Sequence, residues 1–320
     1  MLRAATTGLL AILVLAAPAS AAPRWSEVGS RSGPSARTDH ALAATSSRAV
    51  WLLGGRTGSG RALADLWRLD PRRGRWTRIR PRGSSPPARF GLNLLAEPGG
   101  TLLAFGGQAG SRFFGDTWRF TPRTRRWRRV ASGGPAPRYG AGAAIDPATG
   151  RAYVTHGFTF RGRFDDTWAL TGGAFRDISP AARPLERCLV QAAFHEGGLF
   201  LFGGQSNPRP FLGDLWRLDT ASGRWEELRP RSRPSPRNLY AAAQRGRDWL
   251  IHGGAGARGE EGDLWRLDLG RAGFTRVRSG RRGPGARSAH AATFAGRDLV
   301  VFGGSRGGRA RRDTWVLRGL

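Results

Sequence analysis

The stretch Gly106-Gly107-Gln108-Ala109-Gly110-Ser111-Arg112-Phe113-Phe114-Gly115-Asp116-Thr117-Trp118 contains the pattern around which the chain is organised. It follows an apolar run, 102–105, and joins a glycine pair to an Asp-x-Trp tripeptide through a short loop. The glycine pair recurs at 54–55, 203–204, 253–254 and 303–304, with a weakened copy at 157–158. The tripeptide occurs six times, 48 to 51 residues apart, beginning at Asp65, Asp116, Asp166, Asp214, Asp263 and Asp313. Six sequence repeats therefore make up the chain.

A repeat of this length, with a glycine pair and a downstream aromatic residue, resembles the kelch repeat, the blade unit of a β-propeller. The resemblance covers residues 22–320 and implies an all-β fold, a six-bladed kelch β-propeller with four strands, a to d, in each blade. In the first repeat we expect strands at 38–44, 49–53, 65–69 and 76–79. The resemblance is specific for the fold and says little about function, because one fold hosts many functions.

The two ends of the chain are complementary. Residues 25–28, Trp-Ser-Glu-Val, read as a strand d with no blade before it, and the chain stops just after a strand c at 313–317. We expect the N-terminal strand to complete the sixth blade, which closes the ring and removes exposed sheet edges. Kelch propellers are known for closure of this kind, so this expectation also follows the family.

The N-terminus has the pattern of a secretory signal peptide. A single early arginine, Arg3, is followed by an apolar run at 8–17 and by a small-residue end at 18–21. Such a segment is removed on export, so we expect cleavage near Ala21 and a secreted or periplasmic protein. The run is short for a membrane span. We therefore expect a protein with no membrane span, and a monomer. Cys188 is the one cysteine, so no intramolecular disulfide can form.

The formal net charge is +29, and all 52 basic residues are arginines. One interpretation is the codon bias of a GC-rich genome, and the other is a polyanionic partner. Under either interpretation the surface attracts anions at long range, and more weakly as salt rises.

An arginine begins strand a in every repeat, at Arg37, Arg89, Arg138, Arg187, Arg237 and Arg287. Antiparallel order places the starts of strand a, the b–c loops and the d–a connectors on one face of the disc, which we call the b–c loop face. The a–b and c–d turns lie on the opposite face, the turn face. Since strand a is innermost, the six arginines could form an anion-binding ring at a mouth of the central channel. The alternative is that each is tied to the aspartate that begins strand c.

The b–c loops combine arginines with phenylalanines. The candidates for ligand binding, besides the six arginines, are Phe113, Phe114, Phe164, Arg306, Arg309, Arg311 and Arg312. The fifth repeat differs, because it carries Glu260 and Glu261. Such surfaces bind acidic peptides, sugars or single-stranded nucleic acid. We expect a protein or an acidic carbohydrate as partner, since nucleic acid is unlikely for an exported protein. The alternative is that these are solvated loops with the phenylalanines packed inward.

The histidines give little support for a metal site. His40 and His290 hold the same strand-a position in neighbouring blades, but no dense cluster of ligands surrounds them. His156 and His252 stand just before a glycine pair, where other repeats have Phe or Leu, and we expect them to be core residues. We therefore assign no metal, no other cofactor and no catalytic residue.

Two enzyme families share the repeat. Copper oxidases of the galactose oxidase type need a tyrosine–cysteine cross-link, a second tyrosine and two histidines, and they carry further domains that are missing here. Sialic acid mutarotases are exported six-bladed kelch proteins. An arginine-lined mouth would suit their sugar acid, and Glu186 or His40 could then act as acid or base.

The sequence thus predicts an exported, non-catalytic binding module that recognises an acidic ligand on the b–c loop face. Rigid scaffolds commonly present recognition residues on such loops. The alternative is a mutarotase or epimerase of the sialic acid type.

Overall fold

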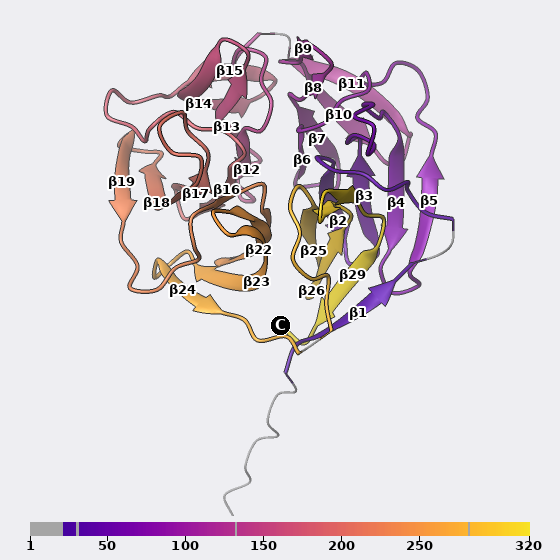
Figure 1. The fold of residues 1–320 in the computed structure, drawn as a ribbon. Coiled ribbons are helices and arrows are strands. Elements are labelled where there is room, and N and C mark those ends of the chain that lie inside the picture. The colour runs from indigo at the N-terminus through magenta and orange to yellow at the C-terminus, as the bar shows by residue number, and fades with distance from the viewer. Residues whose placement is uncertain (1–21, 30–31, 132, 281) are drawn as a thin grey trace, which may run out of the picture.

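The computed structural model describes residues 22–29, 32–131, 133–280 and 282–320, so the predicted signal peptide, 1–21, lies outside the described residues. These residues form a six-bladed β-propeller, as predicted, with the blades arranged around a central axis (Figure 1). Within the described ranges, no helix is long and apolar enough to cross a membrane.

Each blade is an antiparallel sheet in which strand a lies nearest the channel and strand d lies at the rim. Blade 1 contains β2 (Ala41–Ser46), β3 (Ala49–Leu53), β4 (Leu66–Asp70) and β5 (Arg75–Ile79). Blade 2 contains β6 (Asn93–Ala96), β7 (Leu102–Phe105), β10 (Thr117–Thr121) and β11 (Arg126–Ala131), with a small b–c hairpin of β8 (Gln108–Ala109) and β9 (Arg112–Phe113). Blade 3 contains β12 (Gly142–Ile145), β13 (Ala152–Thr159), β14 (Gly162–Thr171) and β15 (Ala174–Asp177).

The other three blades repeat this order. Blade 4 contains β16 (Gln191–His195), β17 (Gly198–Gly204), β18 (Leu212–Asp219) and β19 (Arg224–Leu228). Blade 5 contains β20 (Arg237–Asn238), β21 (Ala241–Arg245), β22 (Asp248–Gly256), β23 (Gly259–Asp268) and β24 (Gly273–Arg276). Blade 6 contains β25 (Ala291–Ala295), β26 (Asp298–Phe302), β29 (Thr314–Arg318) and β1 (Arg24–Val28), with a b–c hairpin of β27 (Ser305–Arg306) and β28 (Arg309–Ala310).

The N-terminal strand closes the ring, as predicted. β1 pairs antiparallel with β29, and the register places Trp25 opposite Leu317 and Val28 opposite Thr314. The two ends of the described chain therefore meet in one sheet, at the bottom of the view in Figure 1.

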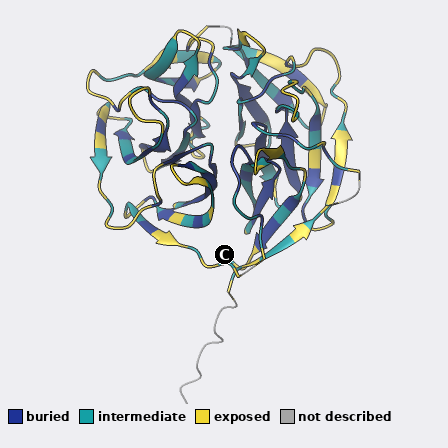
Figure 2. Ribbon diagram, viewed as in Figure 1, coloured by how far each residue is buried: buried dark blue, intermediate teal, exposed yellow. Residues whose placement is uncertain are grey.

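The core lies between neighbouring blades. In β3, Trp51 and Leu53 pack toward blade 2, whereas Val50 and Leu52 pack toward blade 6. Because both faces of such a strand are covered, strand b is apolar along its length instead of alternating. Figure 2 shows the resulting buried interior and the exposed outer edges.

Strand a is interrupted by one left-handed residue, which the sequence did not predict. β2 begins at Ala41 instead of Thr38, because Asp39 has a φ of 56°. The same position is left-handed in every blade, at Asp39, Gly91, Gly140, Leu189, Leu239 and Ala289. Its backbone bonds to the equivalent residue of a neighbouring blade: Asp39 N–H donates to the Ala289 oxygen, and Gly91 N–H donates to the Asp39 oxygen. We call this set of backbone hydrogen bonds around the channel the channel ring.

The glycine pairs are left-handed at both positions, with φ of 66° and 98° at Gly54 and Gly55. A Cβ on Gly55 would lie 2.8 Å from the Thr38 oxygen, so the chain approaches itself too closely for a side chain. In blade 3 the residues at the glycine-pair positions lie one residue earlier than the sequence predicted. His156, with a φ of 60°, takes the first glycine position and Gly157 the second, whereas Phe158 follows the pair. Histidine tolerates this conformation better than most residues.

Candidate functional site: the b–c loop face

The six strand-a arginines lie inside the blades. Each guanidinium makes a two-pronged ion pair with the aspartate before strand c; in blade 1, Arg37 Nη1 and Nη2 lie 2.6 and 2.8 Å from the Asp65 carboxylate oxygens. Arg37 Nη1 also donates to the Gly54 carbonyl, and Nε to Ser35 O. The indole of Trp67 donates to the same carboxylate at 2.7 Å. This Arg–Asp–Trp unit explains the Asp-x-Trp tripeptide, because residues two apart share one face of a strand.

The same unit occurs in every blade. The arginines are at most 2% exposed, and their partners follow in order: Arg37–Asp65, Arg89–Asp116, Arg138–Asp166, Arg187–Asp214, Arg237–Asp263 and Arg287–Asp313. Burial by itself would raise the pKa of the Asp214 carboxyl, but the hydrogen bonds and charge of Arg187 lower it overall. These contacts match the second interpretation of the six arginines, in which each is tied to the aspartate before strand c. Their guanidinium groups donate to partners inside the protein.

Two of the predicted phenylalanines support these units. Phe114 is buried, and the Arg89 guanidinium stacks on its ring at 4.0 Å. Phe164 holds the Arg138 guanidinium at the same 4.0 Å in the next blade. Cation–π stacking of this kind favours the charged partner where it is desolvated. Phe114 therefore packs inward, whereas Phe164 and Phe113 are both half-buried.

Phe113 belongs to an aromatic cluster between blades 2 and 3, which we call the Phe160 cluster and which comprises Phe113, Phe158 and Phe160. The rings of Phe113 and Phe160 meet edge to face with centroids 4.9 Å apart, and Phe158 lies 6.0 Å from Phe113. Phe160, at the tip of the β13–β14 hairpin, is 67% exposed. Together with Leu185, it is one of the two exposed large hydrophobic side chains in the described residues.

Three arginines adjoin this cluster in the sequence. Arg161 follows Phe160 and Arg112 precedes Phe113; both are exposed, and within the described ranges neither takes part in an ion pair, although Arg112 lies over the Phe114 ring at 5.0 Å. Arg163 lies over the Phe158 ring at 5.7 Å and donates to Asn207 of the blade 4 loop. Arginine and aromatic side chains are the types enriched in the cores of protein interfaces.

The predicted blade 6 arginines form a second basic group on this face. Arg306, Arg309 and Arg312 are exposed and Arg311 is half-buried. Glu260 of blade 5 reaches this hairpin and accepts a hydrogen bond from the Gly307 N–H at 2.8 Å. Glu260 therefore holds the blade 6 hairpin, which the sequence did not predict, whereas Glu261 accepts a hydrogen bond from the Ser235 hydroxyl.

The central channel narrows at the b–c loop face. Tyr139 reaches across from blade 3 and donates its hydroxyl to Asp39 of blade 1 at 3.0 Å, and Arg56 pairs with the same carboxylate. Gly91 makes room for this, because a Cβ there would lie 1.9 Å from the Tyr139 ring. Tyr139 and the channel ring border a small cavity of about 70 Å³ at this end.

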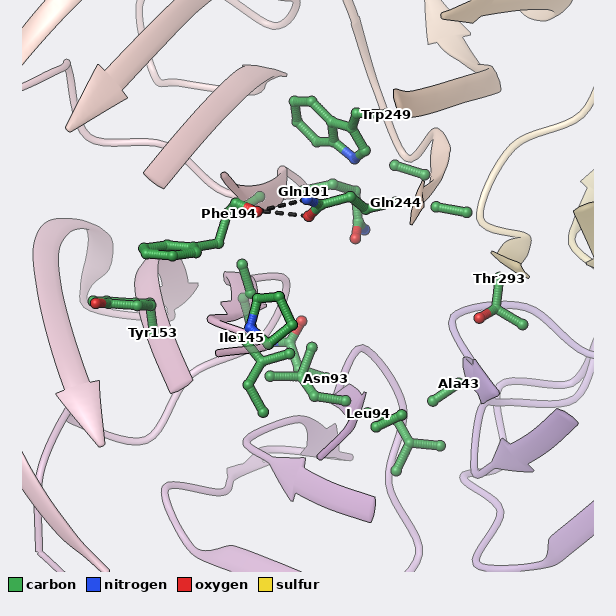
Figure 3. Close-up of a pocket in the computed structure, with 18 of the residues that line it drawn as sticks. Ala43, Asn93, Leu94, Ile145, Tyr153, Gln191, Phe194, Gln244, Trp249 and Thr293 are labelled. Atoms are coloured by element: carbon green, nitrogen blue, oxygen red, sulfur yellow. Dashed lines mark hydrogen bonds between the residues drawn. The ribbon is translucent and has the colours of Figure 1, made fainter. Parts of the chain in front are cut away.

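Beyond the channel ring, a larger cavity of about 820 Å³ extends toward the turn face. Its wall is formed by strand a of all six blades, and many of the side chains are alanine. Figure 3 shows how Gln244 ties neighbouring strands together: its amide donates to the Phe194 oxygen at 2.5 Å and accepts from the Phe194 N–H at 3.0 Å. The a–b turns at 146–149 and 195–197 also line this cavity.

Four of the five histidines, His40, His156, His252 and His290, are core residues in this structure, and His195 is half-buried. His156 and His252 are at most 2% exposed, as predicted, and His252 Nδ1 lies 2.9 Å from His290 Nε2. His40 is buried against Phe302, and burial, together with the Arg37 charge, lowers its pKa to about 3. Among the described residues, no group of three or more His, Cys, Asp or Glu is placed to hold a metal ion.

Six blades, a closed ring and one Arg–Asp–Trp unit in each blade define this protein as a kelch-type propeller. The family model of the KLHDC2/KLHL20/DRC7 Kelch-repeats domain matches residues 19–176 and 178–318. The chain therefore belongs to the Kelch-repeat family, whose repeats generally serve protein–protein interaction.

Curated relatives show the same repeat within longer proteins. The chain is 29% identical over 212 residues to multiple epidermal growth factor-like domains protein 8 of Mus musculus, which covers 60% of this chain and 7% of that protein. It is 28% identical over 187 residues to Kelch domain-containing protein 10 of Homo sapiens, a match that covers 53% of this chain and 40% of that protein. It is 25% identical over 209 residues to Kelch domain-containing protein 3 of Bos taurus, a match that covers 59% of this chain and 53% of that protein. The matches thus span about half or less of each relative's length.

Proposed function

We propose that this protein is an exported, non-catalytic binding module whose b–c loop face recognises an acidic segment of a partner protein. The observation that carries the proposal is Phe160, which is 67% exposed at a hairpin tip and is followed in the chain by the exposed Arg161, with the exposed Arg112 on the adjoining hairpin of blade 2. The equivalent tips of blades 5 and 6, Gly-Ala-Arg-Gly at 256–259 and Arg-Gly-Gly-Arg at 306–309, carry no aromatic residue. Blade 3 thus exposes a large apolar side chain where blades 5 and 6 have none.

The proposed partner segment contains an apolar side chain flanked by carboxylates. The apolar group would pack on the Phe160 cluster, and the carboxylates would pair with Arg112 and Arg161. Arginine suits this role because its planar fork can hold a carboxylate through two hydrogen bonds. The blade 6 group, Arg306, Arg309, Arg311 and Arg312, would extend the same contact to a longer acidic segment. Export rests on the N-terminal sequence pattern.

The test is selection of a random peptide library on the purified mature protein, followed by affinity measurements with the enriched peptides. We expect enriched peptides to combine an aromatic or branched apolar residue with Asp or Glu. The triple variant Phe160→Ser, Arg112→Ser, Arg161→Ser should weaken their binding by about tenfold or more, as for loss of an interface anchor. A variant with Arg306, Arg309, Arg311 and Arg312 replaced by Ser should weaken binding of the longer acidic peptides.

The matched control is the triple variant Ala257→Ser, Arg258→Ser, Arg61→Ser, which removes the same charge from two other b–c loops. It should bind the selected peptides with nearly unchanged affinity. Equal losses in the two triple variants would mean that only net charge matters, and the proposal would fail. Enrichment of acidic sugars instead of peptides, in a parallel glycan screen, would replace the partner class.

A further inference from the structure

The outer edges of blades 1 and 2 carry a concentration of arginines that is separate from the b–c loops. Strand d of these blades, β5 and β11, lies on the outside of the ring, where Figure 2 shows mostly exposed residues. Eleven exposed arginines occupy these strands and their flanking turns: Arg72, Arg73, Arg75, Arg78, Arg80, Arg82, Arg123, Arg125, Arg126, Arg128 and Arg129. We call this surface the basic rim.

The basic rim is nearly free of compensating charge. In segments 70–82 and 121–131 the single acidic residue is Asp70, whose carboxylate accepts the backbone N–H groups of Arg72 and Arg73. Within the described ranges, no rim arginine takes part in a salt bridge, whereas arginines on other blades pair with Asp165, Asp248 and Asp268. Because unpaired like charges repel one another, this arrangement costs stability unless an anion neutralises it.

The composition of the chain does not by itself explain the basic rim, because blades 3, 4 and 6 carry acidic residues at equivalent positions, whereas blade 5 has Thr275 and Arg276 as blade 1 has Thr77 and Arg78. Where blade 2 has Arg128 and Arg129 after the buried tryptophan of strand d, blade 4 has Glu226 and Glu227. Blade 3 has Arg176 and Asp177, and the strand d of blade 6 has Glu27. A codon bias toward arginine would act on all six blades alike.

The two blades form one continuous surface. The connector that leaves β5 runs to the start of β11, where Arg82 N–H donates to the Arg125 oxygen at 2.7 Å and Arg82 pairs in parallel with Arg126. The arginines of blade 1 therefore lead directly into those of blade 2. Along an extended strand, alternate side chains repeat about every 7 Å, which gives a row of separate positive charges.

We infer that the basic rim binds a linear polysaccharide that carries sulfate or carboxylate groups. Repeated anions along an extended chain match a row of guanidinium groups, which bind both kinds of anion through paired hydrogen bonds. Nucleic acid fits less well, because the aromatic residues of these strands, Trp76 and Trp127, are 4% and 6% exposed and provide no platform for bases. This inference does not depend on the proposed recognition of a protein by the b–c loop face.

The experiment uses the mature protein with three probes of similar charge number: a heparin-derived oligosaccharide, an oligogalacturonate and a DNA duplex. The rim variant replaces Arg78, Arg80, Arg82, Arg125, Arg126 and Arg128 with Ser. The control variant removes six exposed arginines that also lack a salt bridge in the described structure but lie outside the basic rim: Arg48, Arg61, Arg224, Arg258, Arg271 and Arg297. Dissociation constants are measured by fluorescence anisotropy at several salt concentrations.

We expect the rim variant to lose about tenfold or more in affinity for at least one of the two oligosaccharides, with a shallower salt dependence, because fewer ion contacts form. The control variant should lose less than about threefold, and the Phe160→Ser, Arg112→Ser, Arg161→Ser variant should bind the sugars normally. Which sugar binds more tightly distinguishes sulfate from carboxylate recognition. Equal losses in the rim and control variants would overturn the inference. Rim-dependent binding that is tightest for DNA would overturn the partner class.

Discussion

At the scale of single residues, arginine serves two different purposes in this protein. Arg237 is fully buried and its five polar contacts are all internal, to Ser235, Gly253 and Asp263. Arg161 lies at a hairpin tip in solvent. The two kinds cannot be separated by residue type, and only the register of the Asp-x-Trp tripeptide distinguishes the internal set. That is why the sequence left two roles open for the strand-a arginines.

Replacement of a buried arginine should be costly. Arg237→Ala should lower the free energy of unfolding by about 3–5 kcal/mol, because it leaves the Asp263 carboxylate without its partner in a mostly buried site. The control Arg224→Ala, on an exposed strand position, should change it by about 0.5 kcal/mol or less. Urea denaturation measures both variants. A loss below about 1 kcal/mol for Arg237→Ala would contradict the structural role.

The buried His40 predicts a specific pH dependence. Its pKa in the folded protein is about 3, against 6.5 for an ordinary histidine, because of burial and the nearby Arg37 charge. The unfolded chain therefore binds more protons below pH 6.5, and the contribution to stability is lost as the pH falls from 6.5 toward 3, at up to about 1.4 kcal/mol per pH unit. His40→Leu, which copies Leu92 of blade 2, should remove this part of the slope. If the free energies of unfolding of the variant and the wild type differed by the same amount from pH 7 to pH 4, this contribution of His40 would be refuted.

At the scale of elements, the repeat specifies most of each blade. Strands b, c and d of blade 1 lie within one residue of the predicted bounds, because apolar periodicity and turn residues mark them. Strand a was placed three residues too early, since a left-handed Asp39 has no signature in one sequence. In blade 3 the predicted glycine pair, 157–158, is one residue too late. His156 takes the first glycine position there, and the sequence alone does not reveal this replacement.

The closing strand β1 is the element on which the ring depends. Deletion of residues 22–29 should remove the outer strand of blade 6 and expose the edge of β29, along with the packing of Trp25 against blade 5. We expect the melting temperature to fall by about 10 °C or more, as for a loss of several kcal/mol. Arg24→Ser keeps the strand and serves as the control. A deletion that melts like the wild type would disprove closure by β1.

At the scale of the whole molecule, sequence reasoning reached the fold, the closure and the two faces, because all three follow from six copies of one pattern. It did not reach the Phe160 cluster, since Phe158 and Phe160 meet Phe113 only through the packing of blades 2 and 3. It also did not reach the basic rim, whose arginines come from segments about 45 residues apart and adjoin only through the Arg82–Arg126 pairing. We therefore expect the recognition residues at positions where the blades differ from one another.

We propose that recognition takes place on the b–c loop face of blades 2 and 3. Hydrogen–deuterium exchange of the protein with and without a peptide selected from the library tests it most directly. We expect slower exchange in the two hairpins, at 108–114 and 157–164, with the turn face unchanged. Protection at the a–b turns 146–149 and 195–197, which line the channel cavity, would contradict this proposal and place binding in that cavity.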